Sequence, residues 1–128
     1  MPVASEHDVT AVRQRVRAVA NELRFGVVDA TKLATASSEL ARNALVHGGG
    51  GTVRLERVSE AGRVGLRLTF ADEGAGIADV GQALADGFTT NGGMGLGLGG
   101  SKRLMHEFAI ESHPGKGTRI TVTHWRRS

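Results

Sequence analysis

The chain is 128 residues long, with 40% hydrophobic and 23% charged residues, an ordinary balance for a folded domain that argues against disorder. This length suits one hydrophobic core, so we expect a single domain over residues 1–128. The absence of cysteine excludes disulfide scaffolds, thiolate metal sites and cysteine nucleophiles. No apolar run suits a membrane span or signal peptide, so we expect a cytoplasmic protein with no membrane partner.

Sixteen Lys and Arg residues against 13 Asp and Glu residues leave a formal net charge of only +3. Domains that bind nucleic acid cluster their basic residues and add stacking aromatics, whereas here the basic residues are spread out and aromatics are few. We therefore expect no nucleic-acid partner. Glycine is the unusual feature, because its 19 residues are about twice the ordinary share.

Two helices are expected in the first part of the chain. The first runs from the capping residue Asp8 to Gly26 and carries apolar residues at helical spacing. The second begins at the capping residue Asp29 and ends at the four glycines of 48–51.

The rest of the chain predicts two β-hairpins with helices between them. Alternating apolar residues place the strands at 52–58 and 64–71, with a turn at 60–62, and at 109–112 and 118–125. Between the hairpins we expect a short helix over 79–86, a glycine-rich stretch over 87–100 and a further helix with Leu104, Met105 and Phe108. This order favours an α+β two-layer sandwich, with a mostly antiparallel sheet covered on one face by helices.

Glu39 and Asn43 form the first candidate site. They lie four residues apart in the second expected helix, so their side chains project from the same face, one turn apart. His47, one turn further along, is a weaker candidate for this face. A solvated helix face with an ordinary polar pair is equally consistent with the spacing.

Asp72 is the second candidate, because it follows an apolar strand and precedes Gly74 and Gly76. A carboxylate fixed on a strand end, beside backbone that a ligand can approach closely, suits an amide or amino donor. The alternative is a turn in which the aspartate accepts hydrogen bonds from local backbone amides.

The third candidate is the stretch from Gly92 to Gly100, in which six residues are glycine. Open backbone N–H groups at the start of the following helix would attract an anion, and Lys102 or Arg103 could add charge, so phosphate is the natural ligand. A flexible linker is the alternative. The stretch is not a P-loop, and it lacks the βαβ context of a dinucleotide-binding fingerprint.

Histidine gives no convincing metal site. His106-Glu107 starts like a zinc-hydrolase motif, but Ile110 stands where the second histidine is required. His7, His113 and His124 are expected at the surface or in turns.

In this order, Glu39-x-x-x-Asn43, Asp72-x-Gly-x-Gly76, the glycine-rich stretch and Gly117-Thr118 resemble the GHKL ATPase/kinase superfamily, whose fold is the Bergerat sandwich. The chain is most similar to small bacterial serine/threonine kinases of the anti-sigma and stressosome-switch type. It resembles RsbT-like switch kinases more than RsbW-type anti-sigma kinases, through the stretches 38–43, 86–90 and 99–105 and Trp125. His106 departs from the acidic residue expected there.

The resemblance implies ATP and Mg²⁺ as cofactors. Asp72 would accept a hydrogen bond from the adenine amine, with a water that Thr118 also contacts, and Gly74 and Gly76 would border the base. Asn43 would offer its side-chain oxygen to Mg²⁺. Glu39 would be the catalytic base that takes the proton of the attacking hydroxyl.

The resemblance also assigns phosphate contacts. Gly93, Gly95 and Gly97 would wrap the phosphates as a closing lid, and Lys102 would add a weaker contact.

A lone domain of this family must act on a separate protein. The resemblance implies phosphorylation of a STAS-domain antagonist, RsbS- or RsbR-like, and a second partner that is a PP2C-type phosphatase, RsbU-like, or a sigma factor. The alternative is a binding module, anti-sigma-like or phosphatase-activating, with little or no kinase activity.

Overall fold

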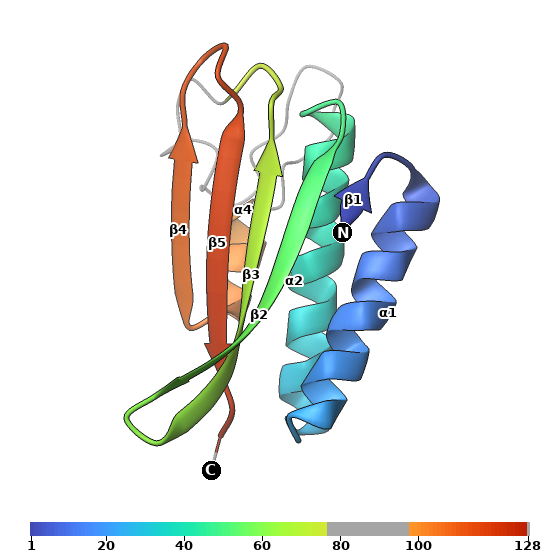
Figure 1. The fold of residues 1–128 in the computed structure, drawn as a ribbon. Coiled ribbons are helices and arrows are strands. Elements are labelled where there is room, and N and C mark those ends of the chain that lie inside the picture. The colour runs from blue at the N-terminus through green and yellow to red at the C-terminus, as the bar shows by residue number, and fades with distance from the viewer. Residues whose placement is uncertain (77–97, 128) are drawn as a thin grey trace.

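The computed structural model describes residues 1–76 and 98–127. The expected helix over 79–86 and the lid glycines Gly93, Gly95 and Gly97 therefore lie outside the described residues. The described elements, in chain order, are β1 (Pro2–Val3), α1 (Glu6–Glu22), α2 (Val27–Val46), β2 (Gly51–Glu60), β3 (Arg63–Asp72), α4 (Leu98–Leu104), β4 (Glu107–Ser112) and β5 (Thr118–Trp125) (Figure 1).

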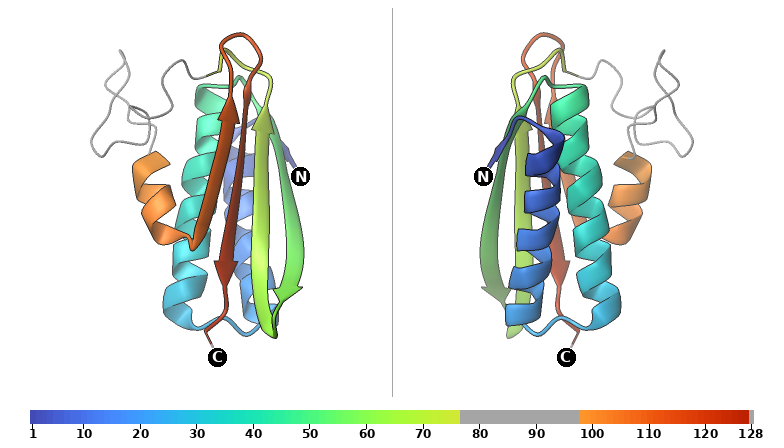
Figure 2. Two further views of the ribbon diagram at one scale, coloured as in Figure 1. Left: turned by 90° about the vertical axis from the view of Figure 1, so that its left-hand side faces the viewer. Right: turned by 90° about the vertical axis from the view of Figure 1, so that its right-hand side faces the viewer.

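The strands form one sheet in the order β1-β2-β3-β5-β4, and each of the four pairings between described strands is antiparallel. All three described helices lie on one face of this sheet (Figure 2). The expected α+β two-layer sandwich is thus confirmed. Among the described residues, no helix is both long and apolar enough to cross a membrane.

The hairpin of β2 and β3 shows why local sequence fixes this part of the fold. Its strands pair in continuous register from Gly51 opposite Asp72 to Glu60 opposite Arg63. Ala61 and Gly62 make the turn with φ values of 50° and 79°, the backbone that a two-residue hairpin turn requires. The predicted turn is confirmed, and the strands are longer than expected.

Two expected helix caps are wrong. Ser5, not Asp8, caps α1, since the Ser5 Oγ accepts a hydrogen bond from the Asp8 N–H while the Asp8 carboxylate accepts one from the Ala4 N–H. Gly26 is the N-cap of α2 and makes no side-chain cap bond. Asp29 is instead buried in the first turn of α2, where it binds His124 near the end of β5 and Arg127 just after β5.

The helix expected after the glycines is also shifted. α4 begins at Leu98, includes Gly99 and Gly100, and ends at Leu104. Phe108 belongs to β4, where it lies opposite Val122 of β5 and packs against the core. Phe108 joins a strand despite its helical spacing from Leu104, because pairing with β5 gives the edge strand backbone hydrogen bonds and packs the Phe108 side chain against the core.

One hydrophobic core fills the space between the sheet and the helices. α1 and α2 contribute Val12, Val16, Leu33 and Leu40, and the strands contribute their inward-facing residues, including Leu66, Leu68, Phe70 and Val122. The core holds α2 against the end of the sheet where β3 stops at Asp72.

Candidate active site

The sheet and α2 together form a cavity at the end of β3. Asp72 is the last residue of β3 and lies directly opposite Thr118, the first residue of β5. α2 turns one stripe of residues toward them, at the spacing of one helix face. The residues that line this cavity, called the Asp72 cavity below, are Leu40, Asn43, Ala44, His47, Phe70, Asp72, Gly76, Leu98, Thr118 and Ile120.

Four of the predicted site residues therefore line one cavity: Asn43, Asp72, Gly76 and Thr118. The weaker candidate His47 lines it as well. Apolar side chains form most of the remaining wall, and a few polar groups on an apolar wall are typical of a site for a small molecule. The volume of this cavity is about 40 Å³.

The Asp72 carboxylate is held in place by the backbone. Its Oδ1 accepts a hydrogen bond of 2.9 Å from the Gly74 N–H, as in a turn aspartate. Among the described residues, no group donates a hydrogen bond to the Asp72 Oδ2. The turn and the ligand interpretations of Asp72 are thus compatible, because the turn uses one oxygen and a ligand could use the other.

Thr118 is positioned by its neighbours in the β4–β5 hairpin. Its Oγ1 lies 2.8 Å from the Ser112 Oγ, which also donates a hydrogen bond of 3.2 Å to the Gly117 carbonyl. If the Ser112 proton is used on that carbonyl, Thr118 donates to Ser112 and presents lone pairs to the cavity.

Glycines surround Asp72 because no larger residue fits there. A Cβ added to Gly48 would lie 2.4 Å from the Asp72 Cγ, and one added to Gly117 would lie 2.1 Å from the Asp72 carbonyl oxygen. A Cβ on Gly74 would lie 2.5 Å from the Gly48 Cα, and one on Gly76 would lie 2.1 Å from the His113 carbonyl oxygen. From the sequence we interpreted residues 48–51 only as the end of a helix, and their packing against Asp72 was not predicted. Four consecutive glycines just before a strand could have indicated a close approach of backbone segments there.

Glu39 is not brought into this cavity. It lies one helix turn before Asn43 on α2, half-exposed, with its Oε1 3.8 Å from the Arg42 Nη1. Arg42 also approaches Glu6 of α1 at 3.7 Å. Lys102 is exposed in the last turn of α4 and does not line the cavity either.

The expectation of a surface position for His124 is wrong. His124 is buried beneath the far end of the sheet, and its Nε2 lies 2.9 Å from the Asp29 Oδ1. His106 stacks on it with ring centroids 4.0 Å apart, and Arg127 binds the Asp29 Oδ2 at 3.0 Å. Nothing in the local sequence links Asp29 to His124, since they are 95 positions apart and meet only through the fold.

This buried group has shifted pKa values. Burial lowers the pKa of His124 and outweighs the raising effect of its hydrogen bond to Asp29. Burial alone raises the pKa of Asp29, but its hydrogen bond and electrostatic interaction with His124, together with the charges of Arg127 and Lys32, leave it lowered. Neutral His124 then donates from Nε2, which leaves its Nδ1 buried without a hydrogen-bond partner among the described residues.

Comparison with known proteins places this architecture. Residues 28–128 match the family model described as "Histidine kinase-, DNA gyrase B-, and HSP90-like ATPase". The chain belongs to this family. It is 46% identical to the serine/threonine-protein kinase RsbT of Bacillus subtilis (strain 168), over 98% of this chain and 94% of that protein. It is 32% identical to the anti-sigma F factor of Geobacillus thermodenitrificans (strain NG80-2), over 91% and 84%.

Solved structures agree on the fold. The catalytic domain of histidine kinase ThkA, in a nucleotide-free form, matches with a TM-score of 0.60 at 14% identity over 98% of this chain and 97% of that one. The mycobacterial sensor histidine kinase MprB matches with a TM-score of 0.61 at 18% identity over 99% and 97%. The expected GHKL membership and RsbT-like resemblance are confirmed, and the chain is an enzyme of this family.

Proposed function

We propose that the chain is an ATP-dependent serine/threonine-protein kinase of a bacterial partner-switching module. The supporting observation is the single cavity in which the sheet contributes Asp72, Gly76 and Thr118 and α2 contributes Asn43. The 46% identity to a protein named as a serine/threonine-protein kinase supports the reaction class.

In this proposal Asp72 and Thr118 recognise adenine. The carboxylate oxygen that does not bind Gly74 accepts a hydrogen bond from the exocyclic amine, which guanine lacks at that position. Thr118 contributes through a shared water, and the apolar walls from Leu40, Phe70 and Ile120 cover the faces of the base. Gly76, with φ of 78°, lines the cavity with backbone atoms alone, which a base can approach closely.

Asn43 is the proposed ligand for Mg²⁺. An amide oxygen suits this hard cation, which binds through few protein ligands and fills its other positions with phosphate and water. No group of three or more His, Cys, Asp or Glu side chains that could hold a metal occurs among residues 1–76 and 98–127, so most ligands here would come from ATP and water. When bound, Mg²⁺ neutralises phosphate charge during transfer.

Glu39 is the proposed catalytic base. Its carboxylate lies one turn before Asn43, on the same side of α2, and it is half-exposed, so a hydroxyl of another protein can reach it. Glu39 takes the proton of the serine or threonine hydroxyl as the oxygen attacks the γ-phosphorus and the bond to ADP breaks. Its ion pair with Arg42 is long and solvated, so it costs little to break when substrate arrives.

The proposed phosphate contacts come from the glycine-rich stretch and from Lys102. Gly93, Gly95 and Gly97 are proposed as the lid over the phosphates, and Lys102 as a contact added when the lid closes. The proposed protein substrate is a STAS-domain antagonist, RsbS- or RsbR-like, and the second partner is a PP2C-type phosphatase, RsbU-like. Such a module works in the cytoplasm, without membrane or nucleic acid.

The test is transfer of labelled γ-phosphate from ATP to STAS-domain proteins encoded beside this chain. We expect labelled STAS protein whose phosphate survives acid, as serine and threonine phosphates do, whereas histidine phosphate is lost in acid. Absence of label on every such protein, with ATP binding intact, would favour the other candidate. That candidate is a binding module, which the 32% identity to an anti-sigma F factor supports and for which a sigma factor is the expected partner.

A further inference from the structure

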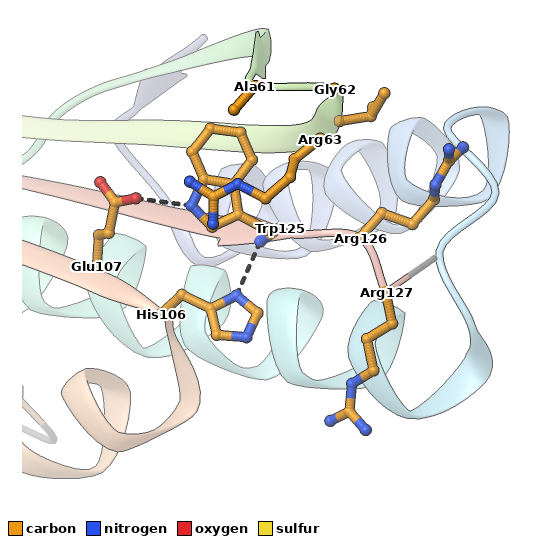
Figure 3. Close-up of a pocket in the computed structure, with 9 residues that line it drawn as sticks. Ala61, Gly62, Arg63, His106, Glu107, Trp125, Arg126 and Arg127 are labelled. Atoms are coloured by element: carbon orange, nitrogen blue, oxygen red, sulfur yellow. Dashed lines mark hydrogen bonds between the residues drawn. The ribbon is translucent and has the colours of Figure 1, made fainter.

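A second groove lies at the opposite end of the sheet from the Asp72 cavity, near the β2–β3 turn and the end of β5 (Figure 1). Its volume is about 720 Å³. Figure 3 shows the side chains that line it, which come from the turn, from His106 and Glu107, and from residues 125–127. Three arginines, Arg63, Arg126 and Arg127, line this distal groove together with Glu107. Two of the arginines are paired with an acid beside the groove, Arg63 with Glu60 at 4.0 Å and Arg127 with Asp29 at 3.0 Å.

Each of these arginines is already held by a defined contact. The Arg63 guanidinium lies 4.1 Å from the centre of the Trp125 ring, and the Arg126 Nη1 donates a hydrogen bond of 3.0 Å to the Leu23 carbonyl. The Arg127 Nε binds the Asp29 Oδ2 at 3.0 Å, while the Arg127 side chain stays 68% exposed. Arginines that are fixed beforehand lose less conformational entropy when a ligand binds.

The buried pair of Asp29 and His124 lies behind the groove and helps to fix Arg127 in place. Asp29 is only 4% exposed and also binds His124, so it is fully enclosed by its own chain. A buried ion pair is weak evidence of a gain in stability, because desolvation offsets the attraction. What the pair does here is hold Arg127 at the edge of the groove.

Two exposed apolar side chains on α2 are next in sequence to Asp29, the residue that binds Arg127. Val27 and Val28 begin α2, directly before Asp29, and they are 82% and 64% exposed. They are the most exposed large apolar residues among the described residues. Neighbouring apolar and arginine side chains are characteristic of surfaces that bind proteins.

We propose that the distal groove, together with Val27 and Val28, binds an acidic segment of a partner protein that also carries apolar side chains. Carboxylates of the segment pair with the guanidinium groups, and its apolar residues cover the two valines. The groove and the Asp72 cavity share no lining residue, so the partner can stay bound while the cavity is occupied. The proposal does not depend on kinase activity.

A nucleic acid would also be drawn to arginines, but the groove suits it less well. Trp125 is the groove's one aromatic ring besides histidine, and it is 4% exposed beneath Arg63, so it cannot stack on a base. The exposed valines would also gain nothing from a phosphate backbone.

The single tryptophan of the chain allows a direct test. In the ¹⁵N-labelled full chain, the Trp125 indole N–H, which donates to the Glu107 Oε2 at 2.6 Å, gives one isolated NMR signal inside the groove. The probe is a short peptide of glutamate and leucine, compared with a peptide in which lysine replaces glutamate. We expect the acidic peptide alone to shift this signal in a saturable manner.

Variants separate a groove from general charge attraction. Arg126→Glu and Val27→Glu should each weaken peptide binding about tenfold, and Val27 is so exposed that its replacement leaves folding intact. The matched controls Arg17→Glu, on the outer side of α1, and Val46→Glu, at the other end of α2, should change it little.

Three outcomes would overturn the proposal. One is peptide binding that leaves the indole signal unmoved, or no binding at all. Another is equal weakening by the groove variants and the controls. The third is tighter binding of a single-stranded oligothymidylate than of the acidic peptide, which would assign the groove to nucleic acid.

Discussion

Two aspartates show how differently a fold can use a carboxylate: Asp29 lies on α2 beside one end of the sheet, and Asp72 ends β3 at the other. Asp29 is buried, and both of its oxygens bind side chains, one from His124 and one from Arg127. Asp72 is half-buried at the wall of a cavity, and its one described hydrogen bond comes from the Gly74 backbone. A carboxylate fixed through one oxygen keeps acceptor capacity for a ligand, whereas one bound through both organises the protein. Changes at the Asp72 end should therefore alter ligand binding and transfer, and changes at the Asp29 end should alter stability.

The largest effect is expected for Glu39→Gln. Loss of the proposed base should slow phosphate transfer about 10²- to 10⁴-fold, while ATP affinity stays close to that of the unaltered chain. Glu22→Gln, near the other end of the molecule, is the matched control. A Glu39→Gln protein that transfers phosphate at the original rate would remove Glu39 from the mechanism.

Asp72→Asn should have the next largest effect. The amide can present an N–H to the adenine amine and leave it without an acceptor, so ATP affinity should fall at least about tenfold, a loss of roughly 1.5–3 kcal/mol. Calorimetric titration with ATP measures this. Unchanged affinity, with the fold intact by circular dichroism, would show that Asp72 does not contact the base.

At the other end, Asp29→Ala should change stability and leave ATP affinity alone. The His124 Nε2–H would remain buried without its acceptor, which costs about 1–3 kcal/mol of unfolding free energy. Urea unfolding gives the free energy, and calorimetry gives the affinity. A loss of ATP binding in a folded Asp29→Ala protein would contradict the separation of the two ends.

A smaller effect is expected from Gly48→Ala. The added Cβ would lie 2.4 Å from the Asp72 Cγ, so the carboxylate must move and ATP should bind about threefold to tenfold more weakly. Gly49→Ala is the neighbouring control: its φ of 73° makes alanine strained, but no atom lies within 4 Å, so stability alone should fall. Equal affinities for the two variants would argue against a packed role for Gly48.

The smallest effect is the pH dependence of the Asp29 end. The pKa of His124 is lowered from 6.5, so the unfolded chain takes up a proton first, and stability should decline as pH falls through that value. The pKa of Asp29 is lowered from 3.8, which adds a further loss only below that pH. Thermal melts of the unaltered chain and His124→Gln at about pH 8 and about pH 5.5 test this. A decline of equal size in His124→Gln would assign it to other groups.

The sequence predicted the parts of the molecule that depend on local patterns. The β2–β3 hairpin follows from alternating residues and a turn at Ala61-Gly62, and the stripe on α2 that carries Asn43 follows from helical spacing. The strand end at Asp72 was equally clear, and its register opposite Thr118 brought the predicted adenine contacts together.

What the sequence missed depends on contacts between distant segments. Aspartate is a residue type favoured at helix N-caps, yet Asp29 is buried because its carboxylate binds His124. Phe108 follows a helical pattern and still joins β4, because pairing with Val122 buries it. The packing of Gly48 against Asp72 likewise requires the end of α2 and the end of β3 to meet. Local sequence patterns do not predict these contacts, because the segments that make them are far apart in the chain.

A crystal structure of the chain with a non-hydrolysable ATP analogue and Mg²⁺ tests the central claim most directly. The account predicts adenine in the Asp72 cavity, with its amine at hydrogen-bonding distance from the Asp72 carboxylate and the metal on the Asn43 side-chain oxygen. A base bound elsewhere, or an adenine amine that contacts neither Asp72 nor a water on Thr118, would contradict it.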